Sequence, residues 1–574
     1  MKLTGFLFAA ALLGSCTQPA AEENYTRHVD PKIGTGGHGH VFVGANVPFG
    51  LVQVGPTSIP QTWDWCSGYH ASDSTVIGFS HTHLSGTGIG DLFDVTVMPV
   101  TGDVTYARGE EADPASGLWS YADRTQEIAR PGYYSVPLTR YGIRAELTAT
   151  ARVGLHRYTF PASEKAAVVF DLENGGCWDK ATETHLAKEG DRTVTGWRHS
   201  TGWAKDQRVY FVAEFSKPFE KFETIGDNYA RASFRTTDGE QVSLKVALSP
   251  VSVEGAKANL AAELSGWDFD ATAKAADKAW NDELSKVKIT TADETARRIF
   301  YTALYHTMIA PSLFCDVNGD YYGSDHAIHR NADFTNYTTF SLWDTYRAAM
   351  PLMTVLHPEK MADIVQTMLH IADEQGRLPV WHLWGNETDC MVGNPGIVAV
   401  ADAIVKGIGG FDREKAFEAI RKTAMNPDRG NGLRMEYGYI PCEMFNEAVA
   451  YDMEYALADG AAARAPPAGG AAGGAGRPQG PPLRGSHSQP RAIPAHRSPW
   501  RPCPGGYSAL ASKFGGGRGG KRRRDTAPRR FDEIRPIIGI YWMHLIDRRS
   551  ASTCKRPTTC KTCFCSAPAS PTPA

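Results

Sequence analysis

Hydrophobic and polar positions follow two different periods in consecutive parts of the chain. Between Tyr25 and about Trp267, short alternating or wholly apolar runs are separated by Gly, Pro, Asp and Asn. These runs cover residues 52–54, 95–100, 133–139, 145–150, 166–172, 209–215 and 242–248. Short strands at this spacing, with no helices between them, are typical of an antiparallel sandwich. The pattern therefore predicts a β-sandwich domain over residues 25–267.

Helical spacing begins at residue 268. Residues 268–294 are Ala-rich and predict a helical linker, and further apolar stripes with the helical period follow. They cover residues 295–306, 345–356, 358–374, 395–406, 414–425 and 443–458. Successive helices whose loops carry aromatic and acidic residues are typical of an α/α toroid, although these helices fall short of six pairs. The predicted fold class is multidomain α+β, a β-sandwich followed by a truncated (α/α)6-type toroid at 295–459.

The helical pattern stops at Asp459. Residues 460–574 are rich in Ala, Gly, Pro and Arg and hold 20 Lys and Arg against 4 Asp and Glu, whereas the rest of the chain holds 40 against 59. Such a sequence buries too little apolar surface to offset its ordering entropy. Its basic run, 521–524, and its last four cysteines suggest nucleic-acid or metal binding, but we reject both, because the preceding chain is acidic and the cysteines lack two well-separated pairs. We interpret 460–574 as a disordered tail read from a shifted frame.

The first sixteen residues resemble an export signal. One Lys precedes a short apolar run, which is too short to span a bilayer as a mature helix. Leu13-Gly-Ser-Cys16 resembles the bacterial lipobox. This predicts a signal peptide at 1–15, a lipid on Cys16, a tether at 16–24, and a periplasmic or cell-surface lipoprotein of a Gram-negative bacterium that touches the membrane through its lipid. The alternative is an ordinary signal peptide with an incidental cysteine. Five further cysteines before residue 459 are too widely spaced to resemble a disulfide framework.

Candidate chemistry is concentrated between residues 340 and 399. This stretch combines four aromatic rings with three acids: Phe340, Trp343, Trp381, Trp384, Asp344, Glu387 and Asp389. A sugar ring offers an apolar C–H face for stacking and hydroxyl groups for hydrogen bonding, so aromatic rings beside carboxylates suit a carbohydrate cleft. The alternative is that the Trp residues belong to the core and the acids cap helices.

Three loops of the sandwich region also carry possible chemistry. Residues 34–50 are Gly-rich but lack the Lys-Ser/Thr of a phosphate loop. Residues 63–69 combine two Trp with an acid. Residues 78–91 hold His81 and His83, which could share one face of an extended segment and bind a metal. A hydrogen-bonded histidine pair is favoured, because no third ligand is evident.

Several blocks resemble glycoside hydrolase family 92. They are Gly34-Thr-Gly-Gly-His, Pro48-Phe-Gly, Trp65-Cys-Ser-Gly-Tyr-His70, Gly78-Phe-Ser-His-Thr-His-Leu-Ser-Gly86, Ser341-Leu-Trp-Asp-Thr345, Gly385-Asn-Glu-Thr-Asp-Cys-Met391 and Gly438-Tyr-Ile-Pro441. The resemblance covers about residues 25–459. It implies a sandwich joined through helices to an (α/α)6 barrel, and a Ca²⁺-dependent, inverting exo-α-mannosidase, most often α-1,2-specific, acting on mannose-terminated N-glycans or mannan.

The resemblance also implies roles for individual residues. Trp343 and Asp344 would contact mannose, Trp65 would line the cleft from the sandwich, and Glu387 with Asp389 would support the barrel end. The family's acid is a Glu in a block like Glu-Gly-Asn-x-x-Gln-Tyr, and its base is an Asp in a block like Gly-Asn-Asp-x-Gly. Neither block occurs in this sequence, so the catalytic residues and the calcium ligands stay unassigned.

Two hypotheses of different class follow. The chain is an exported α-mannosidase, or it is an inactive truncated product that at most binds carbohydrate weakly. Glu387 and Asp389 could themselves act as acid and base, although the family places these groups elsewhere. An incomplete toroid would leave apolar helix faces uncovered, which predicts aggregation.

Overall fold

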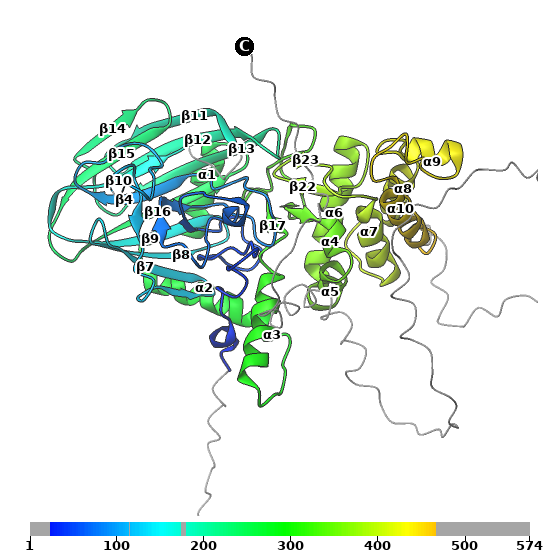
Figure 1. Ribbon diagram of the computed structural model, residues 1–574, viewed down its shortest axis with the longest axis horizontal. Coiled ribbons are helices and arrows are strands. Elements are labelled where there is room, and N and C mark those ends of the chain that lie inside the picture. Colours follow the sequence, from blue (N-terminus) through cyan, green and yellow to red (C-terminus); the bar gives the residue numbers. More distant parts are fainter. Residues whose placement is uncertain (1–22, 114, 174–178, 466–574) are drawn as a thin grey trace, which may run out of the picture. The chain divides into compact units, whose positions relative to one another are not determined.

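Two antiparallel sheets form the N-terminal part of the computed structural model, which describes residues 23–113, 115–173 and 179–465 (Figure 1). The predicted signal peptide, the lipid site at Cys16 and the chain from residue 466 lie outside the described residues. The smaller sheet has the order β1 (Gly55–Thr57), β3 (Gly78–Ser80), β4 (Thr96–Thr101), β10 (Ser163–Asp171), β15 (Tyr229–Thr236), β14 (Lys221–Ile225). The larger has the order β11 (Lys180–Glu189), β12 (Thr193–Thr201), β13 (Gln207–Phe215), β16 (Glu240–Ser249), β9 (Val153–Phe160), β8 (Ile143–Ala149), β7 (Tyr133–Leu138), β6 (Ile128–Arg130).

The inner faces of the two sheets share one apolar core. Phe170 of β10 contacts Phe211 and Phe215 of β13, with ring centroids 6.1 and 6.2 Å apart. All three side chains are buried. Six of the seven predicted apolar runs coincide with strands, and the remaining run, 52–54, forms a single bridge from Val54 to Ala45. Short elements complete this part: the 3-10 helices η1 (Tyr25–His28) and η2 (Trp63–Trp65), and the pair β2 (Thr75–Val76) with β5 (Ser120–Tyr121).

Helix α1 (Val253–Glu263) lies inside the range, 25–267, where the sequence pattern predicts the β-sandwich domain. Ser252 caps it, because the Ser252 hydroxyl accepts the Gly255 N–H at 3.0 Å. The helix packs on β13 and β16 of the larger sheet. Its Asn259 amide donates to Leu248 O at 2.9 Å and to Asp316 Oδ1 at 2.8 Å. No strand is predicted over these residues, which follow the last predicted run, 242–248, and a short Ala-rich helix covers the outside of the sheet there.

The second part of the chain is mainly helical (Figure 1). Its helices are α2 (Phe269–Leu284), α3 (Glu294–His306), α4 (Leu342–Thr345), α5 (Ala349–Leu356), α6 (Pro358–Gln375), α7 (Pro395–Val405), α8 (Arg413–Ala424), α9 (Asn431–Tyr437) and α10 (Ala448–Ala462). Short strands lie between them: β17 (Ser312–Leu313), β18 (Tyr321–Tyr322), β19 (Ile328–His329), β20 (Tyr337–Thr338), β21 (Phe340–Ser341), β22 (Trp381–Leu383) and β23 (Asn386–Glu387). A sheet-rich domain followed by a helical domain confirms the predicted fold class.

Helix α7 is the centre of the helical core. It is apolar on most of its surface and packs against α5, α6, α8 and α10. Its buried Ile397, Val400 and Ile404 join a cluster with residues of α6, such as Met361 and Ile364. None of the helices in the described ranges is long and apolar enough to cross a membrane.

Helix α10 extends beyond the point where the sequence pattern predicts the tail to begin. It runs to Ala462, three residues past Asp459, and Ala458 and Ala465 are buried in the helical core. Its opposite face carries Val449, Met453 and Leu457, whose exposed fractions are 70%, 69% and 43%. These residues recur every fourth position, so they form one apolar stripe on the surface of the described chain.

Candidate functional site

A three-stranded sheet brings two of the sequence blocks together. Strand β22 pairs antiparallel with β21 and with β23, so β21 and β23 run parallel to each other. Both strands therefore leave the sheet at the same edge. Trp343 and Asp344 follow β21, and Asp389 follows β23. The fold thus places these three predicted site residues at one edge, although about 45 residues separate the two blocks.

Trp343 and Asp344 have the polar groups expected of a ligand site. The Trp343 Nε1–H is buried and has no hydrogen-bond acceptor among the described residues. The Arg347 guanidinium lies 4.8 Å from the ring centroid of Trp343. Asp344 is exposed, and its Oδ2 accepts the Ser341 hydroxyl at 2.6 Å. Buried donors are normally satisfied, so an unpaired indole N–H followed in the chain by an exposed carboxylate suits a hydroxyl-bearing ligand.

Glu387 is a structural anchor in this geometry. Its side chain is 8% exposed, and its oxygens accept the N–H groups of Val380 at 2.7 Å and of Trp381 and Asp389 at 2.9 Å. Three backbone donors leave little of the carboxylate free for proton transfer. Glu387 therefore ties the start of β22 to the residues that follow β23.

Asp389 is held by two cations. It forms ion pairs with Arg377 and, at 3.3 Å, with Arg429. Its φ is 54°, and Trp384 and Met391 nearby have φ of 48° and 76°. Left-handed conformations at residues other than Gly are uncommon and tend to occur at functional sites. The strained segment 384–391 is thus fixed by charge and backbone contacts rather than free in solvent.

The remaining aromatic residues divide between core and sandwich. Phe340, Trp381 and Trp384 are buried, so the core interpretation holds for these three. Trp65 lies in η2 of the sandwich, where its Nε1 donates to Asp73 at 2.6 Å and its ring stacks on His70 at 4.3 Å. These partners both belong to the N-terminal part, and Trp65 stays a predicted cleft residue.

A loop of the sandwich holds the β22–β23 hairpin. The Asn386 side chain accepts the Asp206 N–H at 3.0 Å and donates to Asp206 O at 2.9 Å. Trp203 packs on Trp381 with centroids 4.6 Å apart. The Tyr322 hydroxyl donates to the Asp206 carboxylate at 2.9 Å. Nothing in the sequence indicates this role for Asn386, because an Asn beside Gly predicts only a turn.

His81 and His83 are hydrogen-bonded core residues. His81 Nδ1 lies 2.6 Å from Val95 O, and His83 Nδ1 lies 2.8 Å from Gln53 O. Burial lowers the pKa of His81 to about 4 and that of His83 to about 3. His81 Nε2 also lies 2.9 Å from Nε2 of the buried His156. One Nε2 must donate to the other, so a metal is not needed to explain these neutral rings.

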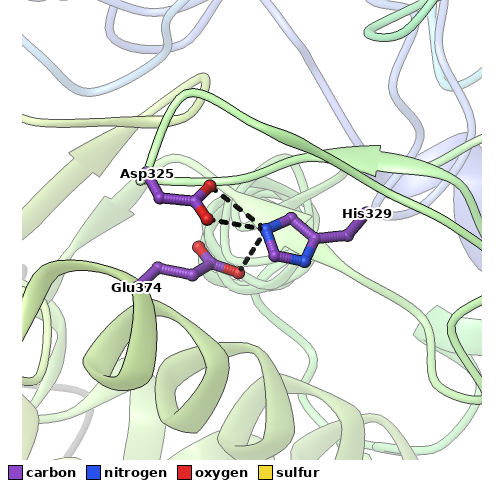
Figure 2. A group of neighbouring side chains, drawn as sticks. All are labelled: Asp325, His329 and Glu374. Atoms are coloured by element: carbon purple, nitrogen blue, oxygen red, sulfur yellow. Dashed lines mark hydrogen bonds and ion pairs between the residues drawn. The ribbon is translucent and has the colours of Figure 1, made fainter.

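One group of His and acidic residues in the described ranges has metal-ligand spacing, namely Asp325, His329 and Glu374 (Figure 2). Their ligand atoms lie within 4.8 Å of one another. Ca²⁺ takes six to eight oxygen ligands, whereas this group offers a ring nitrogen and two carboxylates. The group does not fit the calcium that the sequence resemblance implies.

A cavity of about 320 Å³ lies apart from these residues, between α1 and the larger sheet. Its lining includes Glu214, Lys245 and Leu260. None of the predicted site residues contributes to this lining. The cavity therefore gives no support to a carbohydrate site there.

Comparison with known proteins assigns the chain to a family. The N-terminal domain model of glycosyl hydrolase family 92 matches residues 28–249, and the catalytic domain model of the same family matches residues 255–471. The chain belongs to glycosyl hydrolase family 92. The second match continues past Asp459, in agreement with the extension of α10.

Solved family 92 structures share the fold. A family 92 α-mannosidase from Bacteroides thetaiotaomicron, solved in complex with mannoimidazole, is 38% identical with a TM-score of 0.74, over 77% of this chain and 61% of that protein. An inverting mannosidase of the same family and organism is 28% identical with a TM-score of 0.69, over 77% and 62%. A protein described as an uncharacterized secreted glycosidase of Arthroderma benhamiae is 26% identical over 489 residues, 77% of this chain and 58% of the relative. This family 92 chain thus spans about three fifths of the length of these relatives.

Proposed function

We propose that the chain carries the mannose-recognition half of a family 92 exo-α-mannosidase site. The proposed full reaction is Ca²⁺-dependent, inverting hydrolysis of terminal α-mannosides, with α-1,2 links preferred, on N-glycans or mannan. Support comes from the family match and from the mannosidases that share the fold. The division into domains at 25–267, 268–294 and 295–459 belongs to this proposal, with α10 carried on to Ala462.

The observation that carries the proposal is the unpaired Trp343 N–H, with the exposed Asp344 carboxylate at the next position of the same helical turn. A mannose ring in contact with this turn would offer hydroxyl oxygens to the indole N–H and hydroxyl protons to the carboxylate. The adjoining Asp389 is already paired with arginines, so it supports the edge rather than meeting the sugar directly.

Hydrolysis with inversion needs more than this half-site. An acid must protonate the leaving oxygen and a base must activate water, with the two carboxyl groups about 6.5–9.5 Å apart. Glu387 and Asp389 are occupied by backbone amides and arginines, so they do not supply that pair. Since the family's acid and base blocks are absent from the sequence, we expect this chain to bind mannosides without cleaving them. Calcium enters through the resemblance alone, and the one group of acidic and His side chains with metal-ligand spacing in the described ranges does not fit it.

Export forms part of the proposal. The lipobox-like Leu13-Gly-Ser-Cys16 supports a lipid anchor on Cys16, and a relative is described as secreted. The proposed location is the periplasm or surface of a Gram-negative cell, with no nucleic-acid partner. Resequencing the gene around the Gly460 codon tests whether the following basic segment is read in a shifted frame.

Calorimetric titration of the full chain with α-1,2-mannobiose, in buffer containing Ca²⁺, tests the recognition site. We expect binding that weakens about tenfold or more in Asp344→Asn, because a hydrogen bond to a charged group contributes roughly 1.5–3 kcal/mol. Asp282→Asn, at an exposed helix residue of α2, is the matched control and should bind as the parent chain does.

Two results would count against the proposal. Absence of binding, or equal binding by Asp344→Asn and the control, removes the recognition site. Release of free mannose by the unmodified chain would show that an acid and a base are present after all.

A further inference from the structure

The hairpin β18–β19 contacts the end of helix α6 through Glu374 (Figure 2). Asp325 comes from the hairpin turn, His329 from β19, and Glu374 from the last turn of α6. His329 Nε2 lies 3.1 and 3.2 Å from the two oxygens of Asp325 and 3.5 Å from Glu374 Oε1. Figure 2 shows both carboxylates directed at this one nitrogen.

The separations from His329 Nε2 match two edges of a small coordination polyhedron. With bonds of about 2.0–2.2 Å from Zn²⁺ to nitrogen and oxygen, a tetrahedral site has ligand atoms about 3.3–3.5 Å apart. The separations from His329 Nε2 to the carboxylates, 3.1–3.5 Å, fall around that value, and the oxygens of Asp325 and Glu374 lie within 4.8 Å of each other. One imidazole and two carboxylates are also a donor set that zinc accepts, with a water completing the fourth position.

Other contacts hold the ligand side chains in place. The Tyr321 hydroxyl donates to Glu374 Oε1 at 2.9 Å, and the Ser324 N–H donates to Glu374 Oε2 at 2.7 Å. The Ala327 N–H donates to Asp325 Oδ1 at 3.0 Å. Outer contacts of this kind orient ligands and are a regular feature of metal sites.

The His329 ring is positioned by stacking. Tyr321 is its direct cross-strand partner, and the two rings lie 4.9 Å apart and within 10° of parallel. This stacking sets the plane of the imidazole, and so the direction in which Nε2 points. The register of the β18–β19 hairpin thus helps to orient His329 toward Asp325 and Glu374.

The electrostatics of the group favour an added cation. Two carboxylates face one imidazole, and the Glu374 side chain is only 5% exposed. The C-terminal end of α6 adds further negative potential. Asp325 and His329 are about one third exposed, which leaves a route for an ion from solvent.

We propose that Asp325, His329 and Glu374 bind one divalent transition-metal ion, with Zn²⁺ as the fitting example. The ion ties the β18–β19 hairpin to the end of α6. His329 binds through a deprotonated Nε2, and the ring proton resides on Nδ1. Without an ion, the same residues form a hydrogen-bonded group. The experiment must distinguish this hydrogen-bonded group from a metal site.

Zinc binding to the full chain tests this site at about pH 7.5, where an ordinary imidazole is neutral. Bound zinc per chain is measured by elemental analysis after dialysis against a weak chelator, together with the unfolding temperature with and without ZnCl₂. Because thiolates are good zinc ligands and the chain holds 11 cysteines, the decisive quantity is the difference in bound zinc between variants. The variants are His329→Gln and Asp325→Asn, and the control is His185→Gln, an exposed histidine of β11.

We expect both site variants to lose one zinc ion per chain relative to the control, and to lose the zinc-dependent rise in unfolding temperature. Circular dichroism without metal checks that each variant is folded, and the two substitutions guard against a single misfolded one. Equal zinc content in the site variants and the control overturns the proposal, as does a loss in only one folded site variant. CaCl₂ in place of ZnCl₂ should give no such difference, and a calcium-specific gain would overturn the assignment to a transition metal.

Discussion

Asp91 and Asp94 are buried carboxylates three residues apart, and we expect their replacement by asparagine to change stability in opposite directions. Asp94 Oδ1 lies 2.7 Å from the guanidinium of the buried Arg198, and its Oδ2 accepts from Thr82 and Gln207 at 2.7 and 2.6 Å. Asp91 instead accepts the Ala204 N–H at 2.9 Å. The charge of Asp94 is thus compensated, and that of Asp91 is much less so.

The pKa of Asp91 gives the size of the effect. Burial, with repulsion from Asp179 and Asp94, raises this pKa from 3.8 to about 6. A raised carboxyl pKa contributes stability that is present below pH 3.8 and is lost as the pH rises through about 6. At 1.36 kcal/mol per pH unit, the loss at neutral pH reaches about 3 kcal/mol. An uncharged asparagine at this position can still accept the Ala204 N–H and does not carry this loss.

Urea denaturation at two pH values measures the prediction. Relative to the parent chain, Asp91→Asn should raise the free energy of unfolding by about 2 kcal/mol more at pH 7.5 than at pH 4.5. Asp94→Asn, the matched control, should destabilise by about 3–5 kcal/mol at pH 7.5, because it leaves Arg198 buried with one carboxylate fewer. The reasoning is refuted if Asp91→Asn has the same effect at both pH values, or destabilises as the control does at pH 7.5.

Three further predictions concern the core and the surface. The lowered pKa values of His81 and His83 contribute stability that is fully present above pH 6.5 and is lost as the pH falls toward about 4 and 3. His83→Gln should therefore lose less stability than the parent chain between pH 7 and pH 4, as measured by urea titration. An equal loss in the two proteins contradicts this. Trp280→Phe should destabilise by about 2–4 kcal/mol in the same assay, since it leaves a cavity and unpairs Asn46 O, to which Trp280 Nε1 donates at 2.8 Å; a change below about 0.5 kcal/mol speaks against it. Met453→Glu should reduce concentration-dependent self-association in sedimentation velocity runs, because it puts a charge in the exposed stripe of α10; unchanged association would show that the stripe is not the cause.

The sequence predicts the fold best where burial on both faces leaves a continuous apolar run. Strand β10, with the sequence Ala-Ala-Val-Val-Phe at its centre, is such a case. Strand β11 is missed because its Lys-, Thr- and Glu-rich sequence is mostly exposed and only its pairing with β12 makes it a strand. Helix α1 is missed for a related reason, since its Ala-rich sequence lacks a clear apolar period and packing on the sheet stabilises it.

The candidate site is predicted in its parts but not in its arrangement. The blocks around Trp343 and Asp389 are visible in the sequence, yet their meeting at one sheet edge depends on β22 lying between two parallel strands. The sequence groups Trp384 with the cleft because rings and acids are close along the chain, whereas its side chain is 2% exposed. The spacing of Asp325 and His329 is too common to indicate a metal site until the structure brings Glu374 of α6 beside them.

The double hydrogen bond between Asn386 and the backbone of Asp206 has a consequence for dissecting the protein. A side-chain amide that both accepts from and donates to the backbone of one residue forms the same pair of hydrogen bonds as two paired β-strand residues. The helical part therefore depends on the sandwich for this pair of hydrogen bonds. A helical fragment made alone would lack these two hydrogen bonds and the contact with the ring of Trp203. The turn after β22 would then have no contact with the sandwich to hold its conformation. Fragments cut between residues 249 and 255 should therefore behave as two halves that must be mixed to regain their shape, rather than as two modules that can be recombined at will.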